Sequence, residues 1–248
     1  NGVGGYADTK TYHILSKFGA TFGDHRFQLT SNRKQTRQDT TYLVDPSVDA
    51  LPRTTARFIP GLALDDQPKL TNTQVSADYT HPNLFLNSRV YLQGYYRAQQ
   101  TRFPTFDSRP FGGTDILQGY NQTDVLGSRL DITTPLPVYG KPEIVWGMDF
   151  SSLHGAQSQS LYDQSTYDAT GGRVYSKTGA EASSPSRVFT STAVFAQGEW
   201  TPLAALVLRG GVRHERVKVS SSDFTGGGSF LAASSINFDT TVFNAGFV

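Results

Sequence analysis

The sequence predicts an all-β fold, and three observations support this prediction. Apolar side chains recur at every second position through several long segments, which is the period of a β-strand rather than of a helix. The connections between these segments alternate strictly between short and long. No run of residues approaches the roughly 18 apolar residues of a membrane-spanning helix. Together these features are typical of an antiparallel transmembrane β-barrel, in which only alternate residues face lipid.

The clearest element is a hairpin formed by residues 187–200 and 206–219. One face of this hairpin is apolar and the other is largely polar, because successive side chains of a strand alternate between the two faces. The apolar face carries Val188, Val194, Ala196, Trp200, Leu206, Leu208 and Val212, and the polar face carries Gln197, Glu199, Arg209, Arg213 and Glu215. A soluble sandwich would bury the apolar face, whereas a membrane barrel would turn it toward lipid. The hairpin alone leaves both readings open.

The same alternation predicts about eight long strands, with a further strand begun at the end of the chain. Their expected ranges are 11–23, 26–38, 71–81, 84–99, 121–134, 143–153, 187–200, 206–219 and the beginning of 236–248. The short connections are 24–25, 81–83, 135–142 and 201–205, and the long ones are 39–70, 100–120, 154–186 and 220–235. Short turns on one side and long loops on the other are typical of outer-membrane barrels, and no amphipathic helix is expected.

Composition excludes several classes of function. The net charge is +1, which gives no electrostatic case for nucleic-acid binding. The chain has no cysteine, so disulfides, Cys-zinc sites and thiol chemistry are excluded. The five histidines show no ligand spacing, and no nucleophile elbow or phosphate-binding loop is present. The sequence therefore predicts no metal site and no enzyme activity.

Two segments carry a resemblance to a known family. The run Ala196-Gln-Gly-Glu-Trp-Thr-Pro-Leu203, followed by Leu206-Val-Leu-Arg-Gly-Gly-Val-Arg213, resembles the barrel hairpin of TonB-dependent outer-membrane receptors. In that hairpin a polar-aromatic pair leads into a short Pro-Leu turn, and the next strand ends in Gly-x-Arg. Val145–Phe150 looks like the preceding strand, and Phe238–Val248 is similar to the following one. The likeness is to the siderophore-receptor branch and covers most of residues 71–248, whereas residues 1–70 fit by pattern alone.

The resemblance implies that residues 1–248 are a partial β-barrel domain, an internal fragment of a roughly 22-stranded plugged barrel. The plug domain and the remaining strands are expected to be absent from it. The implied function of the parent protein is uptake of a ferric siderophore through the outer membrane of a Gram-negative-type bacterium, driven by TonB. No cofactor is expected, because iron enters only within the transported chelate. The implied partners are the siderophore, the TonB complex acting through the plug, outer-membrane lipid and lipopolysaccharide.

Two alternatives stay open at this point. The first is a soluble or surface β-barrel of the adhesin type, which would place Val90, Leu92, Leu130, Ile132, Trp146 and Met148 inside a core. The second is the same membrane scaffold carrying cobalamin, haem or a glycan instead of a siderophore.

The predicted ligand contacts lie at the far end of the strand that begins at Leu84. This strand leaves a short turn, so its far end and the next loop are expected to be extracellular. Arginine offers forked donors to carboxylate or hydroxamate oxygens, and aromatic rings offer rigid contact area. The predicted ligand-binding residues are Tyr95, Arg97, Arg102, Phe103, Phe106, Arg109, Phe111 and Tyr120, with Tyr162, Tyr167 and Tyr175 in the following loop. The alternative for each arginine is solvation, a lipopolysaccharide phosphate contact or an ion pair within the loop.

The other charged and aromatic side chains have structural explanations. Cross-strand ion pairs are expected among Arg89, Arg129, Asp131, Asp149, Glu199, Arg209, Arg213 and Glu215. Trp146, Trp200, Phe150 and Tyr79 are expected to form an aromatic girdle on the lipid face.

Overall fold

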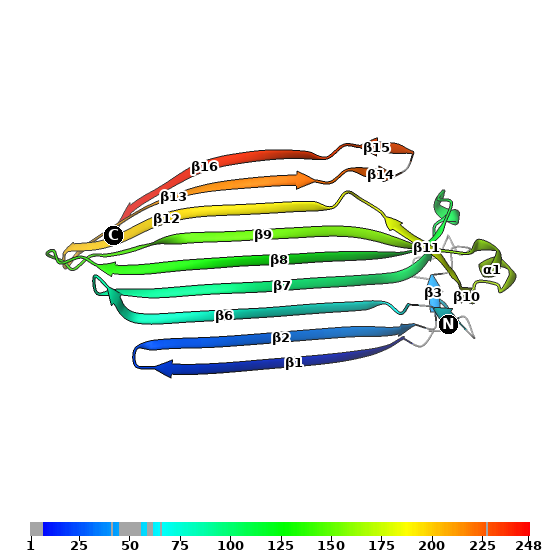
Figure 1. The fold of residues 1–248 in the computed structure, drawn as a ribbon, viewed down its shortest axis with the longest axis horizontal. Helices are drawn as coiled ribbons and strands as arrows, with labels where there is room; N and C mark the ends of the chain where they lie inside the picture. The colour runs from blue at the N-terminus through cyan, green and yellow to red at the C-terminus, as the bar shows by residue number, and fades with distance from the viewer. Residues whose placement is uncertain (1–6, 41, 45–55, 59–61, 65, 227) are drawn as a thin grey trace.

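Nine long strands form one antiparallel sheet in chain order (Figure 1). The computed structural model describes residues 7–40, 42–44, 56–58, 62–64, 66–226 and 228–248. The strands are β1 (Ala7–Phe22), β2 (His25–Thr40), β6 (Lys69–Phe85), β7 (Ser88–Asp107), β8 (Ile116–Pro135), β9 (Glu143–Tyr162), β12 (Arg187–Leu203), β13 (Leu206–Ser221) and β16 (Ser234–Phe247). The all-β antiparallel prediction is confirmed, and each strand that was expected is present.

Smaller elements gather at the long-loop end of the sheet, on the right in Figure 1. The tenth strand of the sheet, β11 (Lys177–Ala182), pairs with the end of β9. Separate two-stranded pairs are formed by β3 (Tyr42–Val44) with β4 (Ala56–Phe58), by β14 (Phe224–Gly226) with β15 (Ser229–Leu231), and by β5 (Ala63–Leu64) with β10 (Val174–Tyr175). The predicted loop at 39–70 lies partly outside the described residues.

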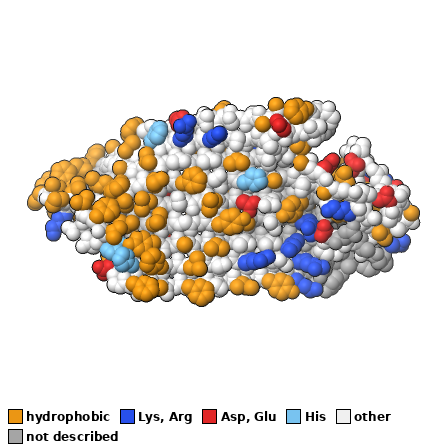
Figure 2. All heavy atoms as spheres, viewed as in Figure 1, with side chains coloured by type: hydrophobic (Ala, Val, Ile, Leu, Met, Phe, Trp, Pro, Cys, Tyr) orange, Lys and Arg blue, Asp and Glu red, His pale blue; other side chains and the backbone are white. Residues whose placement is uncertain are grey.

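The sheet has two chemically distinct faces, as the alternation predicted. The polar face carries Arg129 opposite Asp149, and the apolar face carries Leu130 opposite Met148. Trp146, Met148 and Leu208 on the apolar face are 40%, 44% and 36% exposed. Figure 2 shows hydrophobic side chains spread over the half of the sheet near the short turns. Of the residues that the adhesin-type alternative places in a core, Leu92, Trp146 and Met148 are open, whereas Val90 and Ile132, which pair across β7 and β8, are each 5% exposed. These residues therefore do not form one closed core.

The predicted turn at 81–83 is wrong, because β6 continues through Phe85. The turn consists of Leu86 and Asn87, whose φ angles of 48° and 55° fit a two-residue type I′ hairpin turn. The register between β6 and β7 is irregular between His81 and Phe85. Pro82 falls in this irregular stretch, where its missing N–H interrupts no regular ladder.

The predicted loops at 100–120 and 154–186 are too long. β7 runs on to Asp107, β8 begins at Ile116, and β9 extends to Tyr162. The remaining loops contain a single 3-10 turn, η1 (Arg109–Phe111), and a six-residue helix, α1 (Gln164–Ala169). The expectation of no helix missed α1, which is too short to show a 3.6-residue period. Within the described residues, no helix is long and apolar enough to cross a membrane.

Candidate functional site

A ladder of ion pairs runs across the middle of the polar face. The Asp149 carboxylate lies 2.6 Å from Arg213 Nη1 and 3.8 Å from Arg129 Nε. Arg129 also contacts Asp131 at 2.9 Å, while Arg213 contacts Glu215 at 3.4 Å. Arg209 and Glu199 form a further ion pair of the polar face across the β12–β13 hairpin, with 2.8 Å between Nε and the carboxylate oxygen. The predicted cross-strand pairing is confirmed for Arg129, Asp149, Arg213, Arg209 and Glu199, whereas Asp131 and Glu215 pair within their own strands. Arg89 is exposed and lies outside the ion pairs of the described chain.

Hydrogen bonds extend the ladder onto β6 and β7. Asp78 accepts from Tyr91 Oη and Gln93 Nε2, each at 2.7 Å, and from Ser76 Oγ at 3.3 Å. Polar side chains with fixed partners suit a wall that faces water. The middle of the polar face is thus occupied by its own charge pairs.

Tyr95 and Arg97 lie on the same face as this ladder, but closer to the long-loop end of β7. The Arg97 guanidinium carbon stacks 4.7 Å from the centroid of the Tyr95 ring. The ring itself lies over Gly127, where a Cβ atom would collide with it. Arg97 also lines a hollow of about 560 Å³ with polar residues of β2 and β6, including Asn32, Lys34, Asn72 and Gln74. These four were missed as candidates, although strand alternation places them on the polar face.

Three phenylalanines continue the same side of the sheet. Phe103 packs against Gly119, and the Phe106 and Phe111 rings stack with centroids 5.3 Å apart. The three side chains are 43%, 42% and 65% exposed. Tyr95, Arg97, Phe103 and Phe106 therefore point to the polar face at its long-loop end, and Phe111 joins them through its stacked ring.

Arg102 and Tyr120 are placed elsewhere. They stand directly opposite each other on β7 and β8, at positions that alternate onto the apolar face. Arg102 Nη1 forms an ion pair with Asp66 at 2.8 Å. The structure therefore does not bring these two residues together with Arg97.

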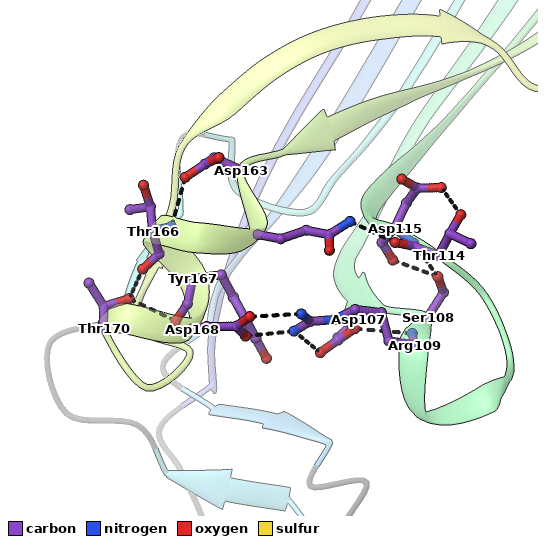
Figure 3. Close-up of polar contacts among 11 residues, drawn as sticks. Asp107, Ser108, Arg109, Thr114, Asp115, Asp163, Thr166, Tyr167, Asp168 and Thr170 are labelled. Atoms are coloured by element: carbon purple, nitrogen blue, oxygen red, sulfur yellow. Dashed lines mark hydrogen bonds and ion pairs between the residues drawn. The ribbon is translucent and has the colours of Figure 1, made fainter.

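Arg109 clamps two loops together (Figure 3). Its guanidinium donates to both carboxylate oxygens of Asp168, at 2.9 and 2.8 Å, and to both of Asp107, at 2.9 Å. It also lies over the Tyr167 ring, 5.5 Å from the centroid. The hydrogen bonds to Asp168 and, with a smaller effect, to Asp107 raise the pKa of Arg109. The hydrogen bond between Arg109 and Asp168 in turn lowers the pKa of Asp168.

The loop tyrosines form a small packed core, here named the tyrosine cluster. Its buried members are Ile116, Tyr162 and Tyr175, with Leu62, Leu64 and Tyr167 packed around them. The Tyr175 ring meets those of Tyr162 and Tyr167 edge-on, at 5.6 and 5.2 Å between centroids. Burial raises the pKa of the Tyr175 hydroxyl. These rings stabilise the loops and present little open surface to a ligand.

Two other features complete the description. A hollow of about 740 Å³ lies at the short-turn end, lined by Glu143, Glu199 and Arg209 among others. It is larger than the hollow beside Arg97 but lies far from the predicted ligand residues. In the part of the chain that is described, no group of three or more His, Asp or Glu side chains could hold a metal ion.

Comparison with known proteins agrees with this arrangement. The family model for the TonB dependent receptor-like β-barrel matches residues 11–248. The rhizobactin receptor of Rhizobium meliloti (strain 1021) is 25% identical over 249 positions, covering 90% of this chain and 32% of that receptor. The chain thus spans about a third of the length of this relative.

Solved structures share the fold at low sequence identity. The copper transporter OprC superposes with a TM-score of 0.69 at 15% identity, over 97% of this chain and 34% of the transporter. The siderophore receptor PiuA from Acinetobacter baumannii superposes with a TM-score of 0.65 at 14% identity, over 97% of this chain and 40% of the receptor. The family match over almost the whole sequence shows that the chain belongs to the β-barrel family of TonB-dependent receptors.

Proposed function

We propose that the complete receptor containing this chain takes up a ferric siderophore through the bacterial outer membrane, powered by the TonB complex. Family membership and the similarity to a rhizobactin receptor support this proposal. Because the chain spans only about a third of that relative, the proposal concerns the whole receptor. The protein moves its ligand without covalent chemistry, and iron is cargo within the chelate.

The two faces of the sheet give the orientation. In outer-membrane barrels the short turns are periplasmic and the longer loops extracellular. The apolar face would then contact lipid, and the polar face would line the wet interior, where a plug domain would contact the ion-pair ladder. The long-loop end of the polar face is accordingly the extracellular mouth.

The main structural support for a ligand site is a cation and several aromatic rings that lie together at this mouth. Arg97 is held over Tyr95, and the exposed rings of Phe103 and Phe106 lie on the same face. A guanidinium donates to the carboxylate or hydroxamate oxygens of a ferric chelate, while the rings bury its organic backbone. Arg102 and Tyr120 on the apolar face, and Arg109 in its carboxylate clamp, are better suited to holding the loops.

Another cargo on the same scaffold is the main competing function. Cobalamin, haem and glycans are also chelates or organic molecules that rings and forked donors could bind. The residues of the barrel wall could bind any of these ligands. The choice of a siderophore therefore depends on the similarity to the rhizobactin receptor. The adhesin-type alternative receives no support from the family match.

Uptake of radioactive iron by whole cells tests the proposal. The complete receptor would be expressed in a strain that lacks its own siderophore receptors, with and without a working TonB system. TonB-dependent uptake of a ferric chelate is expected, and Arg97→Gln combined with Phe103→Ala should weaken chelate binding roughly 10-fold or more. Arg89→Gln is the matched control, since Arg89 lies on the same face of β7 near the short turn. Iron uptake that is the same with and without a working TonB system would refute the proposal. Import of cobalamin or haem without import of a ferric chelate would refute it as well.

A further inference from the structure

A strip of apolar side chains crosses the polar face near its long-loop end. Arg97 on β7 stands opposite Val125 on β8, and the same row continues across β9, β12, β13 and β16, which lie side by side in Figure 1. In register order this row carries Val125, Leu153, Phe189, Val219 and Ile236, and the next row toward the short turns adds Val217 and Phe238. All seven alternate onto the face that carries Arg129 and Asp149. These seven residues are named the inner strip.

Contact with lipid does not explain the inner strip. At the same height the opposite face of these strands is largely polar, because Asp124 stands opposite His154 and Lys218 opposite Asn237. Tyr96 of that opposite face donates a hydrogen bond to Asp124 at 2.7 Å. A strand that passes through lipid has apolar side chains outside and polar ones inside. The inner strip reverses that arrangement, so its residues are suited to a contact on the inner side of the wall.

The inner strip lies open on a face that is otherwise suited to water. Phe189, Ile236 and Phe238 are 41%, 53% and 53% exposed, and Val125 and Leu153 are half-buried. Removing apolar surface from water is favourable, and a contiguous exposed patch of this kind marks an interaction site. Ile236 and Phe238 belong to the last strand of the described sheet. Leu153 and Phe189 are therefore the most informative members, because their strands are paired on both sides.

The inner strip is continuous with the proposed chelate contacts. Its first member, Val125, lines the hollow of about 560 Å³ together with Arg97. A molecule whose polar part lies at Arg97 can therefore extend onto the strip without leaving the polar face. From Val125 to Ile236 the row crosses four strand spacings, about 19 Å, which is longer than a single ring and suits an extended hydrocarbon chain.

We propose that the inner strip binds the hydrocarbon chain of an acylated ferric siderophore whose iron-binding head lies against Arg97. The guanidinium donates to the oxygens of the head, while the strip removes the chain from water. The cargo is thus an amphiphilic chelate rather than a wholly polar one. This inference rests on the proposed function and names the class of siderophore. The competing occupant of the strip is the plug domain of the complete receptor.

Titrations of the complete receptor in lipid nanodiscs test the inference. The probes are two ferric dihydroxamates with the same head, one carrying an octanoyl chain and the other an acetyl group. Each fully buried methylene group contributes about a factor of four to affinity, and the octanoyl chain has about six more of them. The wall covers one side of the chain, so about half of this effect on a logarithmic scale is expected, which is a roughly 60-fold preference for the octanoyl chelate. Partition of the chain into nanodisc lipid is the same for parent and variants, so a difference between them reports binding to the receptor.

The double variant Leu153→Thr, Phe189→Thr should reduce this preference to about fivefold or less, because it removes apolar surface from the middle of the inner strip. Its affinity for the acetyl chelate should stay unchanged, which also shows that the variant is folded. Leu126→Thr with Val188→Thr is the matched control, since these residues are sequence neighbours of Val125 and Phe189 on the opposite face. The control should keep the full preference for the octanoyl chelate.

The outcomes separate this inference from the proposed function. Equal binding of the two chelates by the parent, or a full preference in the double variant, would overturn the acyl-chain site. An equal loss of affinity for both chelates in the double variant would overturn it as well, and is the result expected if the inner strip holds the plug domain. TonB-dependent iron uptake together with any of these results refutes the acyl-chain site alone, whereas absence of ferric chelate uptake refutes the siderophore function.

Discussion

Replacing Ile116 with alanine tests whether the tyrosine cluster holds the long loops together. The Ile116 side chain is fully buried, and it contacts a cluster whose other buried members are Tyr162 and Tyr175. Removing buried methylene and methyl groups from a core costs about 2–5 kcal/mol, and the value is lower where neighbours relax. The cluster is small and partly open at its edge, so about 3 kcal/mol is expected. This energy corresponds to a roughly 100-fold larger population of locally opened loops.

Hydrogen exchange measured on the complete receptor gives the readout. The Gly172 amide donates to Tyr167 O and the Asp163 amide to Ser176 O, both at 2.8 Å, so both report on opening of this loop. In Ile116→Ala these amides should exchange about 100-fold faster, while amides of the β12–β13 hairpin keep their rates. Leu117→Ala is the matched control, because Leu117 is the next residue and faces the opposite side of the sheet. Unchanged rates in Ile116→Ala, or the same acceleration in Leu117→Ala, would show that the cluster does not hold the loops.

Two more changes test the mouth and the helix cap. Gly127→Ala should displace the Tyr95 ring and weaken ferric chelate binding about 10-fold in titrations, because overpacking costs about 1–3 kcal/mol. Gly94→Ala, where an added Cβ meets open space, should bind like the parent, and equal binding by both variants would argue against a role for Tyr95. The Asp163 side chain accepts from the Thr166 and Ser165 donors at the start of α1, which lowers its pKa from 3.8 to about 2. Since the folded pKa is depressed, this cap is intact above about pH 4 and is lost as the pH falls toward 2, so protection of the Thr166 amide should fall over that range. Asp163→Asn should abolish this pH dependence, and a parent protein without it would contradict the assignment.

Alternation predicted the two faces of the sheet and several of its charge pairs. Period-2 patterning fixes which side chains share a face, so Arg129 and Asp149 were expected on one face before their register was known. The hairpin turn brings Glu199 and Arg209 opposite each other in the same way. Such contacts join neighbouring strands, whose pairing follows from short connections.

Contacts between distant loops could not be predicted in this way. Arg109 and Asp168 are 59 residues apart, and neither belongs to a regular strand. Nothing in the local pattern of either loop signals the other, because the loops meet only after the sheet has formed. The placement of Arg102, in contrast, follows from the local pattern. Arg102 lies five residues after Arg97, so regular alternation along the strand puts it on the opposite, apolar face. The sequence instead predicts a loop at 100–120, whereas β7 continues to Asp107.

One extra residue in β7 decides how the mouth is built. Arg102 pairs with Tyr120 and Thr105 with Gln118, so Phe103 and Pro104 together oppose Gly119. A bulge of this kind shifts the alternation by one, and proline fits there because it offers no N–H to the ladder. Without it Phe106 would point to the apolar face, but with it Phe106 joins Phe103 on the polar face. The same shift turns Thr105 toward the side of the tyrosine cluster, where it is buried opposite Gln118. The aromatic surface at the mouth and the packed core behind it therefore arise from a single irregularity.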